Sequence, residues 1–92
     1  MITLFRLEDK NGNGPFFYKN GLARFDSNIK FNDVGLYGFT DKSRFLEPSY
    51  IKFYSSEDFL LYKIIVSSVM SERNGQVVFL EDEVLSKEKV IK

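Results

Sequence analysis

The chain has 92 residues, enough for one domain and too few for two separate hydrophobic cores. It contains no cysteine and no histidine, which excludes disulfides, thiolate metal sites, Cys nucleophiles and the usual Ser–His or Cys–His catalytic pairs. Thirteen basic and thirteen acidic residues give a formal net charge of zero, which argues against a nucleic-acid binder and against an acidic DNA mimic.

The first predicted element is a strand over Ile2–Glu8, because β-forming residues alternate there. An Asn- and Gly-rich turn over residues 9–14 follows, and an extended pattern resumes at Phe16, Phe17 and Tyr18. Asn-Gly pairs between extended segments are typical of a hairpin connection.

The same turn is a candidate for ligand binding, with Arg6, Asn11 and Asn13 as its polar residues. However, it lacks the GK[ST] ending of a phosphate-binding loop and is followed by Pro15 instead of a helix. A plain hairpin turn is therefore favoured over a ligand-binding loop.

Two short elements and one extended stretch are predicted in the middle of the chain. Leu36–Phe39 is read as a strand. Thr40 or Asp41 can cap a helical turn that continues through residue 45, and residues 50–54 are read as extended.

The longest predicted element is a helix over about residues 56–73. Ser55 or Ser56 can serve as its N-cap, the long apolar run over residues 59–70 as its buried surface, and the Asn-Gly pair at residues 74–75 as its stop. We therefore expect this helix to be mostly buried against a sheet.

The last predicted strand covers residues 76–81, and a charged tail follows from Asp82. Strands before and after one main helix indicate a single α+β domain over residues 1–92. In this domain a small, mainly antiparallel sheet would pack on the principal helix.

The apolar run from Phe59 is interrupted by Lys63 and is too short to span a bilayer, and the first ten residues lack the pattern of a signal peptide. These features predict a soluble protein of the cytoplasm. The absence of net charge, together with ten Phe and five Tyr, favours a partner surface or self-association, with a homodimer as one form.

Three candidate residues occur in the order Arg6, Ser55 and Glu83. This order resembles the triad of arginine-directed ADP-ribosyltransferases, and the resemblance implies NAD as the bound cofactor. The chain is shorter than such a transferase usually requires, and the serines have an ordinary use as helix caps. A minimal domain of this type, or a sponge for a nucleotide signal, therefore remains an alternative.

The aromatic residues are the remaining candidates. Stacking on nucleobases would require more positive charge than the chain carries, so nucleic-acid binding is not expected. No metal site is expected either. Aromatics in excess of what a small core can hold predict an exposed surface that binds a partner protein. The candidates are Phe16, Phe17, Tyr18, Tyr37 and Tyr50.

The opening stretch LFRLEDKNGNGPFF also resembles the start of small proteins of phages and prophages. These begin with Tyr/Phe-Arg-Leu/Ile-Glu and reach Gly-Pro-Tyr/Phe after a Gly-rich turn. Weaker similarities occur at residues 38–41 and 76–79, so that about half of the chain is covered. The residues that match the opening motif are Phe5, Arg6, Leu7, Glu8, Gly12, Gly14, Pro15 and Phe16.

The resemblance implies a phage or mobile-element origin and no particular activity. Small phage proteins without catalytic residues often act by binding a host protein. We therefore expect a non-enzymatic binding protein that inhibits a host protein, with a bacterial defence system as the concrete target.

Overall fold

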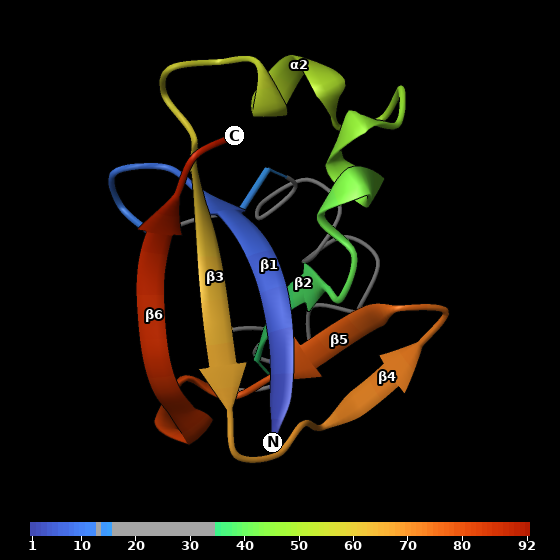
Figure 1. The fold of residues 1–92 in the computed structure, drawn as a ribbon, viewed down its shortest axis with the longest axis vertical. Coiled ribbons are helices and arrows are strands. Elements are labelled where there is room, and N and C mark those ends of the chain that lie inside the picture. The colour runs from blue at the N-terminus through green and yellow to red at the C-terminus, as the bar shows by residue number, and fades with distance from the viewer. Residues whose placement is uncertain (13, 16–34) are drawn as a thin grey trace, which may run out of the picture.

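The computed structural model describes residues 1–12, 14–15 and 35–92. In this part of the chain six strands form one antiparallel sheet in the order β4-β5-β2-β1-β3-β6 (Figure 1). β1 is therefore an interior strand, and β4 and β6 are the two edges. The strands are β1 (Ile2–Glu8), β2 (Leu36–Phe39), β3 (Leu60–Val66), β4 (Ser71–Arg73), β5 (Gln76–Phe79) and β6 (Val84–Val90).

The described helices are all short: η2 (Lys42–Leu46), α2 (Ile51–Tyr54) and η3 (Glu81–Glu83). The predicted principal helix over residues 56–73 is wrong, because this stretch forms β3, a loop and β4. The α+β class with a sheet packed on one main helix is accordingly corrected to a mostly antiparallel sheet. In Figure 1, η2 and α2 lie near the end of the sheet where β3 begins.

The physical reason for this error lies in the position of β3. It runs between β1 and β6, and each of its faces carries buried side chains. Ile64 and Val66 belong to one buried cluster, whereas Leu61 belongs to a second cluster. A strand with two buried faces loses the alternation of polar and apolar residues, so its sequence resembles that of a buried helix.

The Asn-Gly pair taken as a helix stop is instead the turn of the β4–β5 hairpin. Asn74 has φ 54° and Gly75 has φ 84°. Successive positive φ values characterise the type I′ turn, whose twist matches that of paired strands. The described part of the sheet therefore has its tightest hairpin at this turn.

The first buried cluster joins strands that lie far apart in the sequence. Figure 1 shows β4 and β5 running at a steep angle to β1 and β3, so that the sheet is strongly bent. Burial of each such side chain contributes about 1.5–3 kcal/mol as an upper estimate. The cluster consists of Leu4, Ile64, Val66, Val77 and Phe79.

The second cluster contains Leu7, Phe39, Phe45 and Leu61, and partly buried aromatic rings pack around it. The ring of Phe39 meets those of Phe45 and Tyr50 edge-on, with centroid distances of 5.1 and 5.4 Å. η2 and α2 thus cover this cluster by contributing aromatic side chains to it.

The shorter elements that the sequence predicts are only partly present in the structure. The strands Ile2–Glu8 and Leu36–Phe39 are confirmed, and Asp41 caps η2 by accepting a hydrogen bond from the Ser43 amide at 2.9 Å. Residues 50–54 are not extended, because residues 51–54 form α2. The strand predicted over residues 76–81 is shorter, because β5 ends at Phe79 and η3 begins at Glu81, and the charged tail from Asp82 contains β6. The predicted return strand at residues 16–18 lies outside the described residues.

Within the part of the chain that the structure describes, no helix has the length and apolar character needed to cross a membrane.

Candidate functional site

Arg6 and Glu8 occupy the same face of β1, and both are buried, with 2% and 4% of their surface exposed. Arg6 Nε donates to Glu8 Oε2 at 2.8 Å. The other carboxylate oxygen, Oε1, accepts from Lys87 Nζ of β6 at 2.6 Å. Two cations therefore share one buried carboxylate, and the group as a whole carries one net positive charge.

The guanidinium of Arg6 also holds the turn that follows β1. It donates to the backbone oxygens of Tyr37 at 2.8 Å and Gly12 at 3.1 Å. Gly14 packs so closely that a Cβ placed there would lie 3.2 Å from Arg6 Nη1. Arg6 therefore faces neither water nor an open pocket, since it fastens the turn to β1 and β2.

The two other predicted members of the ligand-binding turn are placed as follows. Asn11 is exposed, and its amide donates to Asp9 Oδ1 at 2.8 Å within the turn. Asn13 lies outside the described residues. Of the two that are described, Arg6 is the one whose side chain lies under this turn.

Ser55 and Glu83 do not lie together. Ser55 is the exposed residue that ends α2, before the start of β3. Glu83 lies beyond the other end of β3, where its Oε2 accepts from Ser67 Oγ at 2.5 Å. The seven residues of β3 span roughly 20 Å, so the structure does not assemble Arg6, Ser55 and Glu83 into one site (Figure 1).

Of the five aromatics predicted to bind a partner, Tyr37 and Tyr50 are described. Both are half-buried beside the second cluster, and both rings meet Phe39 edge-on. They contribute to core packing, which leaves only part of each ring accessible. Phe16, Phe17 and Tyr18 lie outside the described residues.

The outer edge of β6 is a feature that the sequence reading missed. β6 pairs with β3 on one side, and the five residues from Leu85 to Lys89 are all exposed. β4, at the other edge of the sheet, has only three residues. The signal was present in the extended pattern VLSKEKV, which was interpreted as a charged tail.

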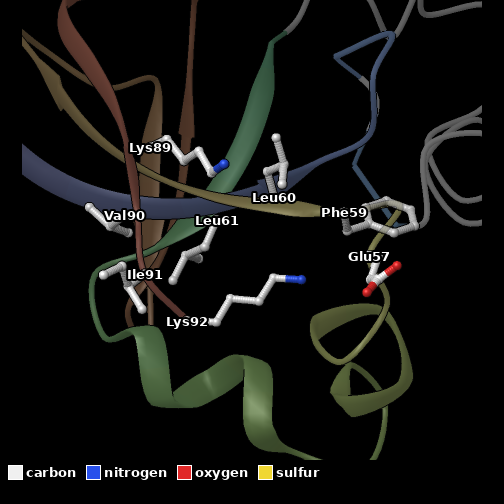
Figure 2. A pocket seen from close by; sticks show the side chains of 8 residues that line it. All are labelled: Glu57, Phe59, Leu60, Leu61, Lys89, Val90, Ile91 and Lys92. Carbon is white, nitrogen blue, oxygen red and sulfur yellow. The ribbon is translucent and has the colours of Figure 1, made fainter.

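An open hollow of about 500 Å³ lies where β6 ends and β3 begins (Figure 2). Its apolar side chains come from both strands, and charged side chains stand around them. The lining residues are Glu57, Phe59, Leu60, Leu61, Lys89, Val90, Ile91 and Lys92.

Lys92 crosses the hollow toward Glu57 in Figure 2, and its Nζ donates to the backbone oxygen of Ser56 at 2.7 Å. Partial burial lowers the pKa of Lys92 from its usual 10.5, and the nearby charge of Glu57 acts in the opposite direction. Lys89 makes no ion pair with any described carboxylate. The hollow therefore combines an apolar floor with an unpaired cation.

Among the described residues no three acidic side chains gather in a way that could hold a metal ion. Comparisons of the chain with protein-family models, with curated proteins and with solved structures find no match.

Proposed function

We propose that the chain is a non-enzymatic binding protein that acts by contacting another protein. The observation that carries this proposal is the exposed edge of β6, which is seven residues long and, in the part of the chain that the structure describes, pairs on one side only. An edge strand offers a row of backbone donors and acceptors to another chain, and such edges serve as binding sites in many complexes.

The placement of the chemically active residues supports a binding function over catalysis. Arg6, the most deeply buried of those predicted site residues that the structure describes, has its donors directed at Glu8 and at two backbone oxygens. Ser55 and Glu83 lie at opposite ends of β3. These residues therefore serve the fold, and the accessible surface is left for recognition.

In this proposal the partner is a protein of a bacterial host, and binding inhibits it. The concrete case is a protein of a bacterial defence system. This step rests on the resemblance of the opening motif to small phage proteins. The motif residues described here have a structural role, because Arg6, Glu8, Gly12 and Gly14 together fix the turn after β1. The proposed target therefore depends on origin, whereas the proposed surface depends on geometry.

The test is affinity capture from bacterial lysate with tagged wild-type chain, followed by gel filtration of the recovered complex. We expect a partner at a fixed ratio to the chain. The Lys42→Glu variant serves as a control for a charge change elsewhere on the surface, because Lys42 is exposed in η2, away from β6. It should recover the same partner as the wild type. Recovery of no partner at a fixed ratio would contradict the proposal.

A further inference from the structure

No strand among the described residues pairs with the outer side of β6, so its backbone is available there. Its inner side pairs with β3 from Leu61 opposite Val90 to Val66 opposite Val84. In a regular strand, alternate N–H and C=O groups point away from the paired side. An extended segment of another protein can bind these groups and add a seventh strand to the sheet.

The side chains of β6 make one face of this edge basic. Lys87 and Lys89 are two residues apart and lie on the same face. Lys87 and Arg6 both pair with the carboxylate of Glu8. The three side chains together therefore retain a net positive charge. Lys89 lies opposite Tyr62 and therefore has no acidic neighbour across the strand pair.

The opposite face of the edge is electrically balanced. Glu88 projects there, directly opposite Lys63 of β3. Acidic side chains of a partner strand would therefore be stabilised on the Lys87 and Lys89 face, because opposite charges across a strand pair attract. This charge complementarity determines which face of the partner is acidic.

The hollow at the end of β6 also favours a partner strand that has an apolar side chain next to its acidic one. Lys89 lines it together with Val90 and Ile91, and 90% of the Ile91 surface is exposed. β6 ends at Val90, and Ile91, the next residue, lines the same hollow as Lys89. A partner strand that places an acid opposite Lys89 can thus place an apolar side chain over the hollow.

A second copy of this chain does not meet these requirements. In a two-fold antiparallel pair of β6 strands centred on Lys87, the two copies of Lys87 oppose each other. Centring the pair on Glu88 sets Glu88 against Glu88 and Lys87 against Lys89. Like charges directly opposite are destabilising, which disfavours both registers. Centring the pair on Ser86 avoids this repulsion, but it would bring Glu83, which belongs to η3 and not to the strand, opposite Lys89, and would place Glu81 instead of an apolar residue over the hollow.

We infer that β6 accepts an extended segment of a partner protein as an antiparallel seventh strand. On its basic face this segment carries an apolar residue over the hollow, followed two positions later by an acidic residue opposite Lys89. The inference rests on the proposed function and specifies its surface and the chemistry of its partner.

A capped peptide as long as β6 provides the probe. Its sequence is Thr-Ile-Thr-Glu-Thr-Glu-Thr. The control peptide has lysine in place of both glutamates. Binding is followed by NMR titration, and amide hydrogen exchange in β6 is measured with and without the peptide. We expect the glutamate peptide to bind and to slow exchange at alternate amides of β6.

Exchanging the charge on the protein tests the predicted pairing. Lys89→Glu should weaken the glutamate peptide about fivefold and strengthen the lysine peptide, because a cross-strand charge pair contributes at this scale. Lys89→Gln should have an intermediate effect, and Lys42→Glu should leave both affinities unchanged. Urea unfolding of each variant verifies that the fold is retained.

Equal binding of the two peptides, or binding without protection of β6 amides, would overturn the inference. So would a dimer of the chain that pairs through β6. If lysate capture recovers a partner equally with wild type and Lys89→Glu, the inference about β6 fails while the proposed function stands. If the glutamate peptide binds β6 as described but no partner is captured, the proposed function fails and the strand site remains.

Discussion

Arg6 and Glu8 form an ion pair of 2.8 Å within a single strand, and both side chains are inside the protein. Residues two apart in a strand project from the same face, so the pair forms without any bend in β1. Lys87 reaches the same carboxylate from β6, which ties the edge strand to an interior strand.

Removal of Arg6 should destabilise the fold strongly. In Arg6→Met, Glu8 keeps only Lys87, and the oxygens of Tyr37 and Gly12 lose their donor, so we expect a loss of about 3 kcal/mol in urea unfolding. Glu47→Gln is the matched control, since its ion pair with Arg44 is largely exposed and contributes less than about 1 kcal/mol. Equal losses in the two variants would contradict this prediction.

Replacing the whole pair should be milder than breaking it. In the double variant Arg6→Met with Glu8→Leu, the buried carboxylate of Glu8 is removed together with its partner, and Lys87, whose side chain is 41% exposed, can extend into water. We expect the double variant to be more stable than Arg6→Met by about 1 kcal/mol or more. A strictly additive double-mutant cycle in urea unfolding would show that the two charges do not interact.

Two glycines should respond very differently to alanine. A Cβ at Gly38 would lie 2.5 Å from both Leu4 Cδ1 and the backbone oxygen of Phe5, so Gly38→Ala should push β1 and β2 apart. We expect a loss of about 3 kcal/mol or failure to fold. Gly12 has open space around it but a φ of +85°, so Gly12→Ala should cost about 1 kcal/mol. Thermal or urea unfolding would compare the two, and equal effects would contradict the packing argument.

Asp41 should titrate below its usual range. The hydrogen bond from the Ser43 amide, and then that from the Ser43 side chain, hold the pKa of this carboxyl below 3.8. Because the pKa is lower in the folded state, the stabilisation from Asp41 is present above the unfolded pKa and is lost as pH falls through the folded pKa. NMR titration of the carboxyl carbon provides the measurement. Asp41→Asn should remove this pH dependence, and a midpoint at or above 3.8 would refute the cap assignment.

NAD should leave thermal stability unchanged. A ligand that binds the folded state raises the melting temperature by mass action. Because Ser55 and Glu83 lie beyond opposite ends of β3, we expect no shift at millimolar NAD or cyclic nucleotides. A concentration-dependent rise that disappears in Glu83→Gln would restore the transferase alternative.

Local signals in the sequence predicted some elements well. Alternation in Ile2–Glu8 and the Asp41 cap depend on neighbours within a few residues, and both appear in the structure. The serine before β3 shows the limit of such signals. Ser56 Oγ accepts from the Asp58 amide at 3.1 Å, as an N-cap would, yet the chain continues into a strand.

The candidate site depended on information that no local pattern contains. Lys87 and Glu8 are 79 positions apart, and their contact exists only because β3 lies between their strands. Likewise, the free edge of β6 is a property of strand order, not of composition. The sequence VLSKEKV could have indicated a strand, but not that this strand would be the last one in the sheet.

The interior position of β1 has a consequence for synthesis of the protein. On the ribosome β1 emerges before both of its neighbours in the sheet, and the two paired residues of β1 and β3 that are closest in the sequence are Glu8 and Leu60. β1 can pair with β2 once Phe39 has been made, but its longer pairing with β3 must wait until Val66. Folding of this sheet must await distant segments, and such non-local pairing slows folding and exposes partly folded chains to aggregation.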